Sequence, residues 1–124
     1  MDGEHDVSPL AGRRGSNWAL PNAASGSIAI TRPLKMVFEP EGVRLPPESG
    51  TRQKPRFVPW ANTIRKTVDP VVEIVWQRIE NWGIAGSGVY WQPILEVAAE
   101  PAMNDQVEQF QALLENSGLE LIRR

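Results

Sequence analysis

The stretch Tyr90–Pro101 constrains this chain most, because its aliphatic run and its prolines leave it few structures to adopt. Ile94–Val97 is a short apolar run, Pro93 stands just before it, and Pro101 stands shortly after it. A glycine-rich loop at 83–88 precedes the stretch, and a segment with helical periodicity follows it. A short apolar run between such breakers is typical of a strand. We therefore expect the central strand of a small sheet here.

Length and composition indicate one globular domain. The chain has 124 residues, 41% of them hydrophobic and 23% charged, and it contains no cysteine. Disulfides, thiolate nucleophiles and cysteine-based zinc sites are therefore excluded. No apolar run approaches the ~20 residues of a membrane span, and no signal-peptide core precedes the domain. We expect a periplasmic or other extracytoplasmic location if the chain is cut from an anchored protein, and a cytoplasmic one otherwise.

Residues 1–27 differ from the rest in composition. They are rich in Gly, Ser, Asn and Pro and show no periodicity, so we expect a disordered lead-in or linker. Trp18 is the exception, since it could dock on the domain. His5 is the only histidine, and it lacks the convergent partners that a metal site needs. The folded domain is expected at 28–124.

A β-hairpin is predicted at the start of the domain. Leu34–Phe38 and Val43–Leu45 read as strands, and Glu39–Gly42 supplies a four-residue connection with Pro and Gly at turn positions. Phe57–Trp60 is apolar again and is expected to pack onto the core.

Two helices are predicted from apolar positions at helical spacing. The first covers about residues 67–82, because Pro70 conflicts with an earlier start unless Thr67 or Asp69 caps the helix. The second covers about Met103–Asn116.

The chain after the first helix forms a crossover unit. Asn104 or Asp105 can cap the second helix, and Ser117-Gly118 ends it. Leu119–Ile122 is then a final strand, and a strand–helix–strand succession places it parallel to the central strand.

The predicted fold class is therefore α+β, of order ββαβαβ, with two helices on one face of a four-stranded mixed sheet. Such a sheet has two edges. Leu119–Ile122 is followed by Arg123 and Arg124, and charged residues protect an edge. Leu34–Phe38 carries only Lys35 as a guard, so it is the more exposed edge for pairing with a second copy in a homodimer. The other interpretation is a monomer in which Trp18 and its neighbours, or Phe57–Trp60, cover this edge.

The sequence shows no catalytic arrangement, so we expect no enzyme activity and no cofactor. A serine triad needs a histidine base, and the predicted domain has none. The loop at 83–88 follows a helix and precedes a strand, which is the wrong order for a phosphate-binding motif. Glu96 and Glu100 would lie about 13 Å apart on a strand, too far for paired-carboxylate glycoside chemistry.

Aromatic residues supply one candidate interaction surface. Five tryptophans are many for this length. Trp76 lies on the apolar face of the first helix and is expected in the core. Trp60, Trp82 and Trp91 are expected around one end of the sheet, and with Tyr90 they could bind a partner. Packing within the domain is the other interpretation.

Basic residues supply a second candidate surface. Residues 31–66 carry eight Lys or Arg against three Asp or Glu, while 67–124 carry three against nine. A basic region can bind nucleic acid, but here the bases are not on one helix face and equally suit ion pairs within the domain. The candidate basic residues are Arg32, Lys35, Arg44, Arg52, Lys54 and Arg56.

The chain resembles the periplasmic domains of the ExbD/TolR family. The resemblance rests on Pro93–Val97, Pro101, Val107–Leu114 and Ser117–Leu119, and elsewhere on the order of elements. The chain is also similar to the C-terminal part of larger membrane-anchored proteins of planctomycete bacteria, through Trp82–Gly86 and Tyr90-Trp91. The resemblance implies an extracytoplasmic dimeric domain. The family's membrane helix and proton-carrying aspartate have no counterpart in these residues.

Taken together, these features predict a non-enzymatic interaction or scaffold domain. It would be the C-terminal extracytoplasmic part of a membrane-anchored, ExbD/TolR-like protein, acting through self-association, a protein partner or the cell wall. The alternative is a basic-faced nucleic-acid-binding module.

Overall fold

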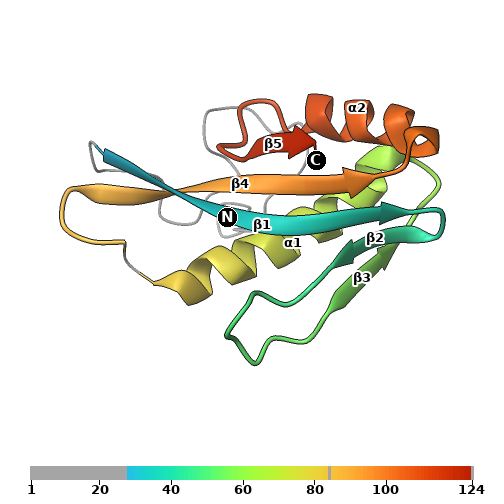
Figure 1. The fold of residues 1–124 in the computed structure, drawn as a ribbon. Coiled ribbons are helices and arrows are strands. Elements are labelled where there is room, and N and C mark those ends of the chain that lie inside the picture. The colour runs from blue at the N-terminus through green and yellow to red at the C-terminus, as the bar shows by residue number, and fades with distance from the viewer. Residues whose placement is uncertain (1–27, 84, 124) are drawn as a thin grey trace, which may run out of the picture.

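A computed structural model describes residues 28–83 and 85–123 as an α+β fold (Figure 1). In chain order the elements are β1 (Ile28–Glu39), β2 (Gly42–Leu45), β3 (Arg56–Pro59), α1 (Ile64–Trp82), β4 (Val89–Ala99), the 3₁₀ turn η2 (Pro101–Met103), α2 (Asn104–Leu113) and β5 (Glu120–Arg123). The lead-in predicted for residues 1–27 lies outside the described residues.

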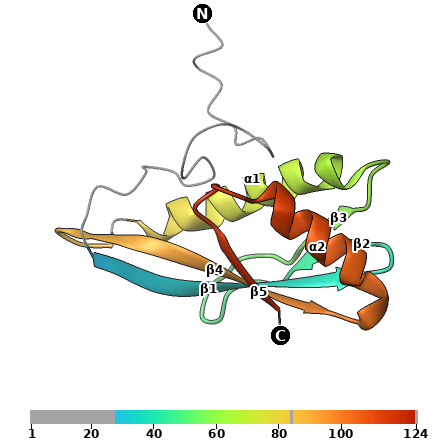
Figure 2. The ribbon, with the colours of Figure 1, turned by 90° about the horizontal axis from the view of Figure 1, so that it is seen from above.

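The sheet is mixed, and both helices cover the same face of it (Figure 2). Its order is β3-β2-β1-β4-β5, with β1 antiparallel to β2 and parallel to β4. The α+β class and the mixed sheet are confirmed, and β5 is parallel to β4 as predicted. The prediction of four strands is wrong, because β3 adds a fifth.

The middle strand of the sheet is β1, and β4 lies beside it. All eleven pairs from Ile28↔Val89 to Phe38↔Ala99 share one parallel register. The predicted central role of Tyr90–Pro101 is therefore only partly right. The prediction that Leu34–Phe38 forms an edge is wrong, since β2 pairs with the end of this segment on one side and β4 runs along it on the other. The edge strands are β3 and β5.

The hairpin turn is tighter than predicted. Glu39 pairs directly with Gly42, so the loop between β1 and β2 is Pro40-Glu41 rather than four residues. Gly42 then lies directly against β3, where a Cβ atom would come within 2.2 Å of the Val58 carbonyl oxygen. Only glycine lets β3 approach this closely. The fifth strand thus depends on a residue that the sequence suggested only as part of a turn.

The first helix begins at Ile64, three residues earlier than predicted. Thr63 is extended, and its hydroxyl accepts a hydrogen bond from the Lys66 amide at 3.3 Å, which caps the helix. Pro70 lies inside the helix and cannot donate to the Lys66 carbonyl, but both residues are exposed, so water can satisfy that carbonyl. The buried Thr67 hydroxyl instead accepts from the Ala61 amide at 2.8 Å.

The second helix is confirmed, but its predicted caps are not. Pro101 opens a 3₁₀ turn, and Met103 occupies the cap position without a side-chain hydrogen bond. Asp105 lies in the first turn, where its charge favours the helix dipole. Val107 and Phe110 are buried against the sheet.

Two prolines lie in the β1–β4 pair without breaking it. The Ile28 amide donates to the Gly88 carbonyl, so even-numbered residues of β1 bond to β4 and odd-numbered ones point to the β2 side. Pro33 is odd-numbered, and its missing N–H therefore costs no bond to β4. By the same register Pro93 points towards β5, so neither proline interrupts this ladder.

The core lies between the sheet and the helices. Alternate β1 residues Leu34, Met36 and Phe38 point into it, and Phe110 stacks edge-on against Phe38 with ring centroids 5.1 Å apart. Trp76, predicted as core, is half-buried and does not belong to the buried cluster.

Candidate interaction site

Arg78 anchors the loop that follows β2. Its guanidinium is buried and donates to the carbonyl oxygens of Leu45, Pro46 and Lys54. Burial lowers the pKa of Arg78 from its ordinary value; the charge of Glu48 opposes that effect and Arg56 adds to it. Because one side chain of α1 holds both ends of the loop, residues 46–54 keep a defined position beside β1.

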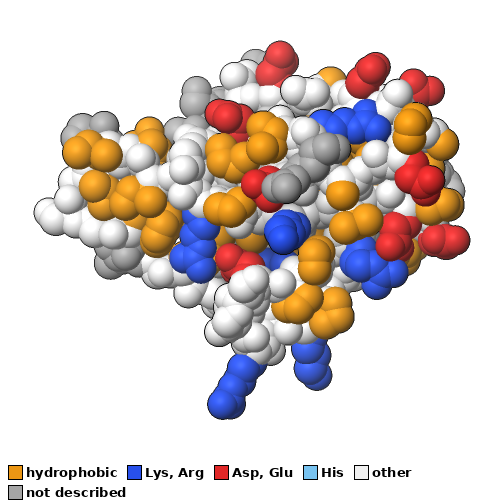
Figure 3. Space-filling model, in the orientation of Figure 1, with side chains coloured by type: hydrophobic (Ala, Val, Ile, Leu, Met, Phe, Trp, Pro, Cys, Tyr) orange, Lys and Arg blue, Asp and Glu red, His pale blue; other side chains and the backbone are white. Residues whose placement is uncertain are grey.

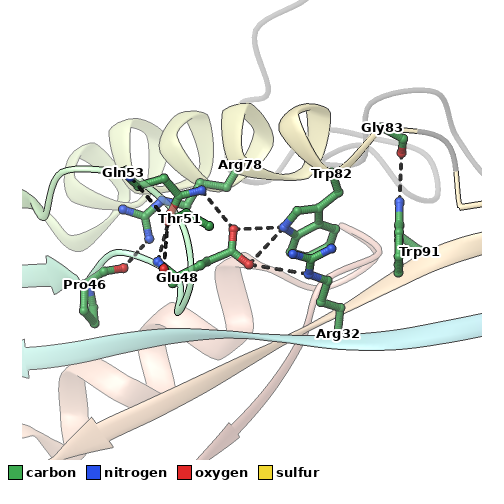
Figure 4. A network of polar contacts seen from close by, with 9 residues as sticks. All are labelled: Arg32, Pro46, Glu48, Thr51, Gln53, Arg78, Trp82, Gly83 and Trp91. Atoms are coloured by element: carbon green, nitrogen blue, oxygen red, sulfur yellow. Dashed lines mark hydrogen bonds and ion pairs between the residues drawn. The ribbon is translucent and has the colours of Figure 1, made fainter.

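Glu48 lies at the centre of a polar network in this loop (Figure 4). The indole N–H of Trp82 donates to its carboxylate at 2.9 and 3.0 Å, and the Gln53 amide donates at 3.0 Å. Arg32 Nε lies 3.5 Å from the Glu48 Oε2 atom. The Glu48 side chain is only 12% exposed. Its charge is therefore met by three donors from three separate parts of the chain.

Arg32 is held against two tryptophans. Its guanidinium carbon lies 4.4 Å from the ring centroid of Trp82 and 5.4 Å from that of Trp91, and the two rings meet edge-on. The Trp91 indole donates to the Gly83 carbonyl at 2.8 Å. These contacts fix the direction of Arg32 by cation–π attraction. Among the described residues, its terminal Nη atoms make no hydrogen bond.

A hollow of about 540 Å³ opens next to this network. It lies between β1, the 46–54 loop and the end of α1. Among the described residues, its charged lining is Arg32, Glu48 and Arg52, and its other lining residues are Thr51, Gln53, Asn81 and Trp82. Arg52 is exposed, and within the described part of the chain it forms no hydrogen bond or ion pair. The described lining of this hollow thus carries a net positive charge, and the hollow lies beside β1.

Among the described residues, the strand beside this hollow has an edge with no neighbouring strand. β2 pairs with only the last three residues of β1, Val37–Glu39. Within 28–83 and 85–123 no strand lies on that side of β1 residues 28–33, which we call the open edge. By the register, the N–H groups of Ala29 and Thr31 and the carbonyls of Ala29, Thr31 and Pro33 point outward there.

The same end of β1 carries exposed apolar side chains. Ile28 is 61% exposed and Ile30 is 37% exposed. Both lie on the helix side of the sheet, in register with Val89 and Trp91 of β4. In the part of the chain that the structure describes, an unpaired strand edge and exposed isoleucines therefore coincide at one end of β1.

The predicted aromatic surface divides into separate places. Trp82 and Trp91 contact each other beside Arg32, as expected for one end of the sheet, and we call these three residues the tryptophan cluster. Trp60 lies at the other end of β1, where its indole donates to the Glu39 carbonyl at 2.8 Å and its ring packs on Phe38. Tyr90 alternates with Trp91 and so lies on the opposite face of β4. The prediction that Trp60 joins the other two is wrong.

The predicted basic residues do not form one surface. Arg32 is in the tryptophan cluster, and Arg44 lies on the helix-free face, paired with Glu39 at 2.9 Å. Arg52 and Lys54 are in the loop, while Lys35 and Arg56 belong to β1 and β3. On the helix-free face Figure 3 shows Lys and Arg side chains separated by Asp, Glu and apolar ones.

Sequence reasoning missed Glu48, Gln53 and Arg78. Arg78 left a signal, because it interrupts an otherwise apolar helix face three residues after Val75. An arginine at such a position must find acceptors in the protein. Glu48 left none, since its partners come from β1, the loop and α1, which only the fold brings together.

The described residues hold neither a group of His, Cys, Asp or Glu side chains suited to a metal nor a helix that is long and apolar enough to cross a membrane. In comparisons with known proteins, the chain matches no family model, no curated protein and no solved structure.

Proposed function

We propose that this chain is a non-enzymatic interaction domain whose binding element is the open edge of β1. The observation that carries the proposal is the mismatch between a 12-residue strand and the three residues that β2 covers. Uncovered strand edges accept a further strand, because main-chain hydrogen bonds supply affinity and alternate side chains supply specificity.

The neighbouring side chains favour the same function. A two-stranded ribbon is marginally stable in water, and here Ile28 and Ile30 add exposed apolar surface to it. A third strand would supply the missing main-chain partners and would cover part of that surface. The remainder of the prediction belongs to the proposal too: an extracytoplasmic, ExbD/TolR-like domain of an anchored protein, joined to a second copy, another protein or the cell wall.

Amide hydrogen exchange on the 124-residue chain, followed by NMR, tests this function. At low protein concentration we expect the amides of Ala29 and Thr31 to exchange fast and those of Ile30 and Arg32 to exchange slowly, because only the latter bond to β4. Protection of Ala29 and Thr31 that grows with concentration would identify a second copy as the partner. Protection that is independent of concentration would mean that the chain covers its own edge, and the proposal would fail.

The alternative function, nucleic-acid binding, has a separate test. Phosphate contacts give an affinity that falls steeply with salt. We expect no salt-dependent retention of the chain on DNA or RNA, because its basic residues lie on different parts of the fold. Retention at low salt that Arg52→Glu and Lys54→Glu together abolish would favour the alternative.

A further inference from the structure

The hollow beside the open edge suggests what the added strand contains. Resting on the proposed function, we propose that the open edge binds an extended peptide whose acidic side chain enters the hollow between Arg32 and Arg52. The occupant is a segment with alternating residues, one acidic and two apolar.

The positions of the side chains follow from β-sheet geometry. Residues directly opposite each other in paired strands point to the same face. Arg32 points to the helix side, where its guanidinium lies on Trp82 and contacts Glu48. A peptide residue opposite Arg32 therefore directs its side chain into the hollow, and the residues opposite Ile30 and Ile28 direct theirs onto the same face.

The charges of the hollow favour an acidic residue at that position. Of the charged residues that the structure describes, two arginines and one glutamate line it, and the glutamate already accepts hydrogen bonds from Trp82 and Gln53. Arg52 has no ion-pair partner among the described residues, and only the Nε end of Arg32 approaches Glu48. A carboxylate that reached both guanidinium groups would make charge-assisted hydrogen bonds, which are stronger than neutral ones.

The exposed isoleucines specify the other two positions. Ile28 and Ile30 are 61% and 37% exposed, so apolar peptide residues opposite them would remove this surface from water. The peptide would run antiparallel to β1, as β2 does further along the same edge, because antiparallel pairs bond more favourably. In peptide order the pattern is acidic, any residue, apolar, any residue, apolar.

The probe is a fluorescent peptide with capped ends, Ser-Glu-Thr-Val-Thr-Val-Thr, titrated with the full chain and followed by anisotropy. We expect Arg52→Glu to weaken its binding about tenfold or more, because an attractive pair becomes a repulsive one. Lys54→Glu is the matched control. It changes the charge of the same loop but does not line the hollow, so we expect a smaller loss. A peptide with Lys in place of Glu should bind Arg52→Glu better than it binds the unchanged protein.

A second pair of variants separates this inference from the proposed function. Thr31→Pro removes one outward N–H at a position equivalent to Pro33, while Thr31→Val keeps it. Loss of binding in Thr31→Pro with no effect of Arg52→Glu would leave strand pairing intact and overturn the acidic specificity. Equal binding by Thr31→Pro and Thr31→Val would overturn strand pairing itself.

Three further results would overturn the inference. The first is equal binding of Ser-Val-Thr-Glu-Thr-Val-Thr, in which the acid stands between the two valines in either strand direction, because the hollow would then not read the position of the acid. The second is no binding up to about 1 mM peptide while hydrogen exchange shows the edge uncovered. Self-association detected by sedimentation at the same protein concentration, and blocked by Thr31→Pro, would identify a second copy as the occupant instead.

Discussion

The two halves of β1 have the same pattern of side chains but very different surroundings. In the second half, Leu34, Met36 and Phe38 are at most 3% exposed, because β2, β4 and the helices surround them. In the first half, Ile28 and Ile30 continue the same alternation onto the same face, yet they are substantially exposed. Beside them lies only β4 among the strands of the described chain.

This comparison shows what the alternation of apolar and polar residues along β1 determines and what it leaves to other elements. Alternating apolar residues indicate which face of a strand is apolar, but the cover for that face comes from other elements. In the second half the cover is part of this domain. In the first half we propose that another polypeptide supplies it. On this proposal, β1 is structural at one end and binds a partner at the other.

The largest expected difference between the two halves is in stability. We expect Phe110→Ala to lower the free energy of unfolding by about 3–5 kcal/mol, because it leaves a cavity beneath Phe38 in the covered half. Ile28→Ala should lower it by no more than about 0.5 kcal/mol, because its side chain is mostly exposed. Urea denaturation measures both. A similar loss from the two substitutions would show that the first half of β1 is covered as well.

A smaller loss of stability is expected when the anchor of the 46–54 loop, which borders both halves of β1, is removed. Arg78→Met keeps an unbranched stem in the core but removes the donors to three backbone carbonyls. We expect a loss of about 2–3 kcal/mol, because the buried Leu45 carbonyl and two part-buried carbonyls then lose this donor. Gln77→Met, an exposed neighbour on α1, is the control and should change stability by about 0.5 kcal/mol or less.

Arg78→Met also tests whether the 46–54 loop contributes to binding as well as to stability. If Arg78 positions the 46–54 loop, then Arg78→Met should also weaken binding at the hollow, whereas Gln77→Met should not. Unchanged stability in Arg78→Met would mean that the loop holds its position without the anchor.

The sequence predicted the elements that have their own periodicity. Both helices followed from apolar spacing, and the parallel placement of β5 followed from the strand–helix–strand succession. The ends of the helices were predicted less accurately than their existence. Thr63 caps α1, which begins three residues before the expected start, because Pro70 is tolerated on the exposed side of the helix.

The arrangement of the sheet could not be read from local patterns. β3 has only four residues and ends in Pro59, so its sequence resembles that of a loop. It forms a strand because Gly42 allows it to approach β2 closely. The parallel pairing of β1 with β4 joins segments about sixty residues apart in the sequence. No local pattern in β1 predicts this pairing. The site depends on that pairing, since it brings Arg32 to Trp91.

The smallest expected effect concerns a charged pair in the covered half of β1. Arg44 donates two hydrogen bonds to Glu39, at 2.9 and 3.0 Å, on the helix-free face of the sheet. These hydrogen bonds lower the pKa of Glu39, with a further contribution from the charge of Arg44. The Arg44–Glu39 pair thus lies beside the covered half of β1 but is in contact with water. It therefore tests whether burial, or position along β1, determines how much a residue contributes to the stability of the fold.

The sign of the pH dependence follows from the direction of this shift. A carboxyl group with a lowered pKa in the folded state stabilises the protein above its unfolded pKa, and this contribution is lost as the pH falls through the folded pKa. We therefore expect the small stability difference between the unchanged protein and Arg44→Gln to shrink in acid. NMR titration of the Glu39 carboxyl should give a higher midpoint in Arg44→Gln, since its strongest donor is gone. If the midpoint is the same in both proteins, the pair does not persist in solution. A stability difference as large as that of Phe110→Ala would show that position along β1, rather than burial, sets the contribution of a residue.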